Sequence, residues 1–172
     1  MQSPETDEIV GLVERFGSCF GWYDNKIDLK GQDLRSVATP ECALTAHSPI
    51  WGTKEGAERA VPLTEVRTRI ARLLRLTRAT REDMHVSIHP SGEALGLFLR
   101  LKFRPAGLPV TMRTQTLAFV ATATRTGDGL RISQVDEWSA SDPEAASRIL
   151  VEHHGWPVDT LLRPQQAFGA AS

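Results

Sequence analysis

The chain has 172 residues, of which 41% are hydrophobic and 24% charged, a balance typical of a folded globular protein. Twenty Lys and Arg residues against 21 Asp and Glu leave a formal net charge of -1. This charge argues against nucleic acid or an anionic membrane as the main partner, because both select for a basic surplus. The length fits a single domain over residues 1–172, with a core over about 6–150 and a C-terminal extension over 151–172.

Two cysteines, Cys19 and Cys42, are too few for a disulfide framework in a chain of this length. Two reduced thiols in the cytosol are favoured over one isolated disulfide, which is the open alternative. The segment 1–8 contains acids where a signal peptide has basic residues, and no apolar run approaches the ~20 residues of a membrane helix. We therefore expect a soluble, cytoplasmic protein with no membrane partner.

The front half of the chain shows helical periodicity. Apolar residues recur at helical spacing between Ile9 and Phe20, which predicts a first helix that begins near Ser3. A second short helix is expected over 31–37, followed by a short strand over 42–48. Thr53 resembles the N-cap of a third helix, which Pro62 interrupts or restarts.

From Thr64 onward a helix carries an apolar stripe at spacings of three and four residues, formed by Val66, Ile70, Leu73 and Leu74. Arginines mostly occupy its other faces. A solvated surface is the favoured interpretation of these arginines, with a phosphate-binding or nucleic-acid-binding face as the alternative.

After Asp83 the period of the pattern changes to two, as in half-buried strands. Strands are predicted over 84–88, 95–103, 110–124 and 130–138. They are followed by a helix from Asp142 towards His153 and an irregular tail over 155–172.

Long consecutive strands joined by short turns form an antiparallel meander, and the preceding helices are the natural cover for its apolar face. Long strands twist and curl, so such a sheet closed by helices leaves a conical cavity. The expected fold class is therefore α+β, with a cone-shaped, curled antiparallel sheet packed on N-terminal helices around a pocket for a small organic molecule.

This order of elements, with a meander that ends in Glu137 and Trp138, resembles the nuclear-transport-factor-2-like superfamily, whose fold is a cystatin-like α+β barrel. Within it the chain is similar to SnoaL-like polyketide cyclases and scytalone dehydratase over roughly residues 6 to 150. The similar segments are Tyr23-Asp24-Asn25-Lys26-Ile27-Asp28 and Met84-His85-Val86. The resemblance implies that Asp24 and His85 meet in the pocket and that Tyr23 orders a water above the substrate.

Scytalone dehydratase has a second histidine further along the sheet, where this chain offers Phe98 or Leu99. A different set, Arg113-Thr114-Gln115 together with Glu137, resembles the Arg-x-Asp and second Asp of limonene epoxide hydrolase. Gln115 cannot serve as the acid of that mechanism.

A histidine can give and take protons at neutral pH, and a carboxylate partner fixes its tautomer. In the catalytic interpretation Asp24 orients and charges His85, His85 moves the proton, and Tyr23 and Arg113 stabilise an enolate or a leaving oxygen. In the structural interpretation Asp24 caps a turn and His85 is an exposed strand residue.

The strand over 110–124 places Arg113, Gln115 and Phe119 on one face, which is a binding-site composition if that face lines the cavity. Arg113 is expected to pair with Glu137 across neighbouring strands, or else to face solvent. Further candidates for substrate binding are His47, Leu99 and Trp22.

The predicted function is a cofactor-independent acid–base enzyme of polyketide or related secondary-metabolite biosynthesis. It is a lyase or isomerase that dehydrates, cyclises or isomerises a small polycyclic substrate, without cofactor or metal. The first alternative is a non-catalytic small-molecule-binding or dimerisation module. The second is an epoxide hydrolase-like enzyme that uses Arg113, Gln115 and Glu137. The resemblance also implies a homodimer formed through the outer face of the sheet.

Overall fold

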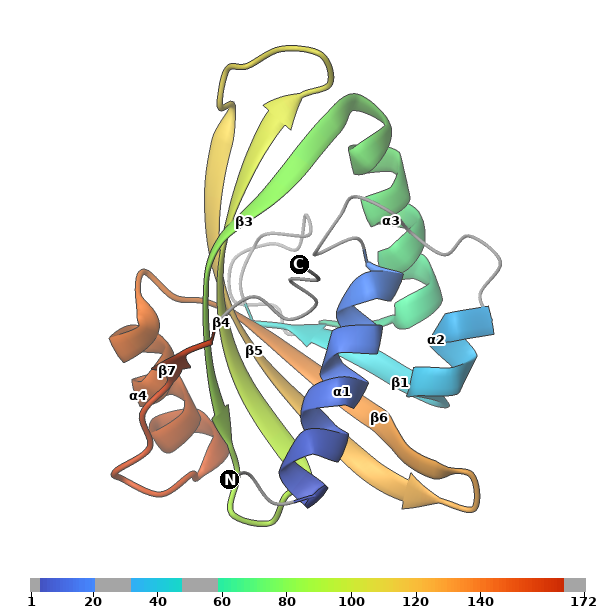
Figure 1. Cartoon of the computed structure of the whole chain (residues 1–172), viewed down its shortest axis with the longest axis vertical. Coiled ribbons are helices and arrows are strands. Elements are labelled where there is room, and N and C mark those ends of the chain that lie inside the picture. Colours follow the sequence, from blue (N-terminus) through green and yellow to red (C-terminus); the bar gives the residue numbers. More distant parts are fainter. Residues whose placement is uncertain (1–3, 21–31, 48–58, 166–172) are drawn as a thin grey trace.

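A computed structural model describes residues 4–20, 32–47 and 59–165. Two helices precede the first strand, a third lies between the second and third strands, and a fourth follows the long strands of the sheet (Figure 1). In chain order they are α1 (Pro4–Cys19), α2 (Gln32–Val37), β1 (Ala38–Ala46), β2 (Arg59–Pro62), α3 (Leu63–Leu76), β3 (Thr77–Ile88), β4 (Ala94–Pro105), β5 (Arg113–Thr126), β6 (Gly129–Ser139), α4 (Pro143–His154) and β7 (Arg163–Pro164).

The described strands form one seven-stranded sheet in the order β2-β1-β6-β5-β4-β3-β7. Neighbouring strands are antiparallel except β1 and β6, which pair in parallel. The long strands β3 to β6 form the predicted meander and curl around the N-terminal helices without closing into a barrel (Figure 1). The predicted α+β class with a curled sheet packed on helices is confirmed.

Three local predictions differ from the structure. The segment Arg59–Pro62, predicted as helix, is strand β2, which pairs with β1 and buries Val61. Strand β3 starts at Thr77 rather than 84, since its first half carries charged residues that hide the alternation. Strand β1 starts at Ala38 rather than at 42. It contains Pro40, which lies in the stretch between Ala38 and Ala43 where the pairing register with β6 shifts, and such an irregularity tolerates a missing N–H.

The concave face of the sheet holds the larger hydrophobic core. The odd-numbered residues of β4 from Leu95 to Leu101 point into it, as the predicted alternation requires. Helix α1 covers this face with apolar residues at helical spacing, among them Ile9, Leu12 and Phe16, all at most 2% exposed. The side chains that shape the interior of the cone therefore come from both layers.

The convex face carries a second, smaller core under α4 (Figure 1). The even-numbered Phe98 of β4 and Val120 of β5 pack there with Leu150 of α4. Trp156 and Leu162, from the tail predicted to be irregular, join this cluster, and β7 adds to the edge of β3. Their burial explains why this part of the C-terminal segment is ordered.

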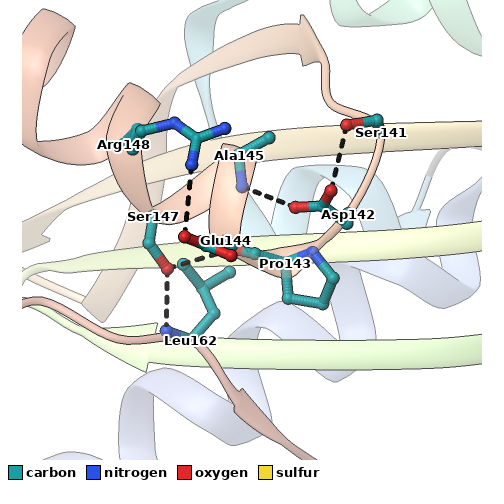
Figure 2. A network of polar contacts seen from close by, with 8 residues as sticks. All are labelled: Ser141, Asp142, Pro143, Glu144, Ala145, Ser147, Arg148 and Leu162. Atoms are coloured by element: carbon teal, nitrogen blue, oxygen red, sulfur yellow. Dashed lines mark hydrogen bonds and ion pairs between the residues drawn. The ribbon is translucent and has the colours of Figure 1, made fainter.

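The start of α4 is fixed by a network of polar contacts (Figure 2). The Oδ1 atom of Asp142 accepts a hydrogen bond from the backbone N–H of Ala145 at 2.7 Å. This bond is the main reason why the pKa of Asp142 is below its ordinary value. Ser147 Oγ donates to the carbonyl of Pro143 and accepts from the N–H of Leu162 at 3.2 Å. The same hydroxyl therefore ties the helix to the returning tail.

Cys19 and Cys42 are both free and buried, as expected for two thiols. Burial, and secondarily the Glu41 carboxylate, raises the pKa of the Cys42 thiol to about 12. Cys42 is therefore a neutral, unreactive core residue near pH 7. Within the described ranges, no helix combines the length and the apolar character needed to cross a lipid bilayer.

Gly96 lets α4 approach the sheet closely. A Cβ at this position would lie 2.5 Å from Leu150 Cδ1, and Leu150 is buried and cannot swing away freely. We expect Gly96→Ala to lower the free energy of unfolding by about 1–3 kcal/mol through this overpacking, as measured by urea denaturation.

Gly11 offers a matched control, because a Cβ there would approach only Arg15, at 3.7 Å. Gly11→Ala in the middle of α1 should raise stability by up to about 1 kcal/mol. An unchanged midpoint for Gly96→Ala would contradict the close approach of α4.

Candidate functional site

The concave face of the sheet encloses an apolar pocket between α1, α3 and the strands. The volume of this pocket is about 110 Å³. The described part of its lining has twelve apolar side chains: Phe16, Phe20, Leu44, Val66, Ile70, Leu73, Leu74, Ala79, Leu101, Phe103, Leu117 and Phe119. Three polar residues complete this lining, namely Arg113, Gln115 and Glu137.

The elements place these side chains for simple geometric reasons. Residues of β5 that share odd parity face inward, so Arg113, Gln115, Leu117 and Phe119 form one row along the pocket. Helix α3 supplies the opposite wall from its apolar stripe at spacings of three and four residues. Its first turn carries Glu65, which the helix dipole favours and which forms an ion pair with Arg69.

Glu137 is the pocket residue with the most restricted environment, because its side chain is 0% exposed. It lies opposite Phe119 on β5 and beside Ala46 on β1, in the interior of the sheet. The backbone N–H of His47 donates to its carbonyl at 2.8 Å, which fixes the main chain at this point. A carboxyl group is therefore held rigidly against an otherwise apolar cavity.

Arg113 and Gln115 lie towards the other end of the row. Gln115 is opposite Leu101 and Arg113 opposite Phe103, where the Arg113 side chain becomes exposed. The Nε2 of Gln115 is buried and has no hydrogen-bond partner within the part of the chain that the structure describes. The polar groups of the pocket thus lie at two separate places, the two donors on β5 and the carboxyl group of Glu137 on β6 beside Phe119.

The predicted cross-strand pair of Arg113 and Glu137 is not formed. The register places Glu137 opposite Phe119, six residues from Arg113, which corresponds to about 20 Å along a strand. An arrangement like that of limonene epoxide hydrolase, with Arg113, Gln115 and Glu137 around one reacting atom, is not supported by this spacing. The register between strands is set by the whole sheet and not by local alternation, which explains the error.

His85 lies on the convex face and not in the pocket, which corrects the predicted position. It is opposite Phe98, whose side chain belongs to the outer core, and the two rings meet edge to face at 5.9 Å. Its Nε2 hydrogen-bonds to Asp83 at 3.1 Å. Its neighbours Met84 and Val86 pack on the inner core, so alternation turns His85 outward.

The predicted catalytic residues Tyr23 and Asp24 and the predicted substrate-binding residue Trp22 lie outside the described residues. A dyad of Asp24 and His85 within the cone is not supported, because His85 points to the opposite side of the sheet. Leu99 does face inward and is 1% exposed, but it belongs to the core next to the pocket and not to the pocket lining. Phe119 lies on the pocket wall.

His47 also lies on the convex side, within a polar cluster that the sequence analysis missed. Its Nε2 and Asp136 Oδ1 are 2.8 Å apart, and its ring stacks on Trp138 at a centroid distance of 4.0 Å. Gln134 donates from Nε2 to the other oxygen of Asp136 at 3.0 Å, and the Trp138 indole N–H hydrogen-bonds to His154 at 2.9 Å. Even-numbered residues of β6 and the last turn of α4 meet here.

The alternation on β6 contained the signal for this cluster. Asp136 and Trp138 share the parity of Gln134, opposite to that of Glu137, and therefore face away from the pocket. The contributions of His47 and His154 could not be foreseen, because they depend on the pairing of β1 with β6 and on the position of α4.

The cluster predicts a dependence of stability on pH through His154. Burial, assisted by repulsion from His47 and His153, lowers the pKa of His154 below its ordinary value of 6.5, against an opposing effect of Asp136. The unfolded chain therefore binds a proton at this residue at a higher pH than the folded chain does. The contribution of His154 to stability is complete above pH 6.5 and decreases as the pH falls through that value.

We expect the thermal midpoint of the wild type to fall more between pH 7.5 and pH 5.5 than that of His154→Gln. The Gln side chain cannot titrate and can still accept the hydrogen bond of Trp138 through its amide oxygen. Parallel pH profiles for the two proteins would exclude His154 as the titrating group.

Apolar wall residues such as Phe16, Phe20, Val66 and Ile70 were identified in the sequence only as core positions. Their helical spacing indicates burial but does not distinguish a packed core from a cavity wall. Among the residues that the structure describes, no three or more His, Cys, Asp or Glu side chains are grouped to hold a metal ion. The described groups can therefore offer a ligand an apolar enclosure, a buried carboxyl group and two donors at the far end.

Neither a family model nor a curated protein sequence matches the chain. Solved structures do match it. The Kfla4162 protein from Kribbella flavida superposes with a TM-score of 0.51 at 18% identity, covering 82% of this chain and 94% of that one. A domain with a cystatin-like fold from Nostoc punctiforme gives a TM-score of 0.50 at 12% identity, covering 92% and 90% of the two chains.

An NTF2-like protein from Pseudomonas putida KT2440 follows with a TM-score of 0.49 at 10% identity, covering 85% and 94%. Proteins with the provisional names polyketide cyclase and ketosteroid isomerase are among the matches at lower TM-scores. At these identities the likeness is one of fold. The curled sheet and its helices have the architecture of the cystatin-like fold.

Proposed function

We propose that the protein binds a small, largely apolar organic molecule in its cone and catalyses a proton transfer on it, with Glu137 as the group that carries the proton. The observation behind this proposal is a fully buried carboxyl group on the wall of a mainly apolar pocket. Burying a carboxyl group is costly, and such groups gather at functional sites.

Proton transfer suits this composition because it needs few reactive groups. A positioned carboxyl side chain can accept a proton from one atom of a ligand and return it to another. Isomerisation, cyclisation and dehydration each include such a step. In the form that the resemblance to SnoaL-like polyketide cyclases and scytalone dehydratase implies, the substrate is a polyketide-like or related secondary metabolite, and Glu137 here takes the role first assigned to His85.

The size of the pocket limits the substrate. Pockets for drug-sized ligands measure roughly 300–1,000 Å³. The cone offers about 110 Å³ and is lined mainly by aromatic and aliphatic side chains. These dimensions support a compact ligand with a small ring system rather than a large polycyclic one.

Exchange of carbon-bound hydrogen tests the proposal without knowledge of the natural substrate. A panel of small cyclic ketones and enones is incubated with the protein in D2O, and deuterium at the carbon next to the carbonyl is followed by NMR. We expect at least one compound to exchange faster with the wild type than with Ile70→Trp, in which the larger side chain fills the pocket from α3. Equal rates for both proteins across the panel would count against catalysis in the cone.

The second candidate is a non-catalytic binding module, which the position of His85 outside the pocket favours. It predicts that the same ketones bind in the pocket and that Ile70→Trp weakens their binding. None of them would exchange deuterium faster than in buffer alone. The proposed homodimer is tested separately by sedimentation. Because α4 covers part of the outer face of β4 and β5, a dimer through this face would have to use the remaining strands or α4 itself.

A further inference from the structure

Two side chains that are hydrogen-bond donors stand next to each other on one wall of the pocket. Arg113 and Gln115 are two residues apart on β5 and face the same side, so their Cα atoms are about 7 Å apart. A guanidinium group has five N–H donors and no acceptor, and the amide of Gln115 adds an NH2 group. This end of the pocket is thus rich in donors and has one positive charge.

Neither side chain donates a hydrogen bond to another described residue of the protein. The Nε2 of Gln115 is buried, and it has no hydrogen-bond partner among the described residues. Arg113 forms no ion pair or hydrogen bond with the described residues, in contrast to Arg69, Arg100 and Arg125, which all pair with acids. A buried donor without a partner costs free energy, which a ligand acceptor at this place would recover.

Apolar side chains of β4 lie next to the two donors. Leu101 and Phe103 of β4 lie directly opposite the two donors, and both line the pocket. Apolar neighbours exclude water from the buried amide of Gln115, so a carboxylate that accepts its hydrogen bond is held more strongly there than at an open surface, while the more exposed Arg113 supplies the positive charge. Glu137, the acidic residue among the described pocket lining, is six residues further along the row, opposite Phe119.

We infer that the ligand of the cone is an apolar carboxylic acid, whose carboxylate is held by Arg113 and Gln115 and whose hydrocarbon body extends along Leu117 and Phe119 towards Glu137. This inference rests on the proposed function, since it assigns the substrate class of the same pocket. The two ends of the site have different roles. The donors fix the acid group near the opening, and the far end of the hydrocarbon body, where the proton is exchanged, points towards Glu137.

Placing the ligand in the opposite direction would bring two carboxylates together. A ligand carboxylate beside Glu137 would be repelled within an apolar enclosure, and the guanidinium of Arg113 would lack a counter-charge. The separation of the donors on β5 from the carboxyl group of Glu137 on β6 therefore fixes the orientation of the ligand as well as its class.

The test compares two probes of the same shape, 4-cyclohexylbutanoate and 4-cyclohexylbutan-1-ol, by isothermal titration calorimetry or by chemical-shift titration at pH 7.5. We expect the wild type to bind the acid at least tenfold more tightly than the alcohol. Arg113→Gln should lose most of this preference while its affinity for the alcohol stays within about twofold. Gln115→Leu should also weaken binding of the acid, by a smaller factor than Arg113→Gln does.

Arg104→Gln is the matched control. Arg104 lies on β4 next to Phe103, but with opposite parity and outside the pocket, so its removal changes the net charge equally and should leave the preference intact. Loss of the preference in Arg104→Gln to the same extent as in Arg113→Gln would show a general effect of charge and overturn the inference.

The outcomes separate this inference from the proposed function. If acid and alcohol bind equally and Ile70→Trp weakens both, the carboxylate anchor is wrong while the pocket and its proton chemistry stand. If neither probe binds, or Ile70→Trp has no effect on either, both proposals fall together. A preference for the acid that depends on Arg113 and Ile70 supports both.

Discussion

Glu137→Gln is expected to lower the rate of deuterium exchange into a turned-over ketone by roughly 100- to 10,000-fold, the range typical of a single positioned acid–base group. The amide has nearly the same shape as the carboxyl group but cannot take up a proton from carbon. Glu137 is fully buried opposite Phe119, and because Gln has the same size as Glu, the substitution leaves the size of the pocket unchanged. Initial rates at saturating ketone measure the effect, and ligand titration shows whether affinity is retained.

Glu152→Gln serves as the control for this experiment. Glu152 is an exposed residue of α4 on the other side of the sheet, and its replacement removes the same charge without touching the cone. Its exchange rate should equal that of the wild type. A Glu137→Gln protein that folds, binds the ketone and exchanges within threefold of the wild type would remove Glu137 from the mechanism.

Phe98→Ala is expected to lower the free energy of unfolding by about 3–5 kcal/mol, the typical cost of truncating a buried aromatic residue. Phe98 is 0% exposed and lies at the centre of the outer core, where it packs with Ala118, Val120 and residues of α4. A domain has a total stability of only about 5–15 kcal/mol, so this loss is large. Urea denaturation followed by circular dichroism measures it.

The same variant tests whether the two faces of the sheet are independent. Phe98 points away from the pocket, so the fraction of Phe98→Ala that stays folded should bind pocket ligands with wild-type affinity. Leu108→Ala, at a position that is 57% exposed, should change stability by no more than about 0.5 kcal/mol. If the truncation of Phe98 abolished binding without a loss of stability, the outer core would have to shape the pocket directly.

Alternation within the strands carried most of the information that the sequence offers about the site. The shared parity of Arg113, Gln115 and Phe119 placed all three on one face, and the structure brings them to one pocket. The same rule assigns His85 to the face opposite Met84 and Val86, in conflict with the short similarity to scytalone dehydratase over Met84-His85-Val86. The structure follows the alternation, because a strand buries its apolar side chains whatever motif they belong to.

Contacts between distant segments could not be predicted in this way. Alternation gives the face of a residue but not its partner on the next strand, so the separation of Arg113 from Glu137 appears only with the register of β5 and β6. The polar cluster around Trp138 likewise requires β1 to lie beside β6. The burial of Trp156 and Leu162 depends on a second core on the convex face, whereas the expected layers placed helices on one side only.

The parallel pairing of β1 with β6 has a consequence for how the chain folds. Strands β1 and β2 join the sheet only through β6, whose residues follow β1 by about 90 positions, as in the pairing of Leu44 with Val135. On the ribosome the pair of β1 and β2 therefore cannot join the rest of the sheet until most of the chain has emerged, and such distant pairing slows folding. A nascent chain that ends before β6 has neither β1 nor β2 in the sheet, so the site of Glu137 is completed late in synthesis.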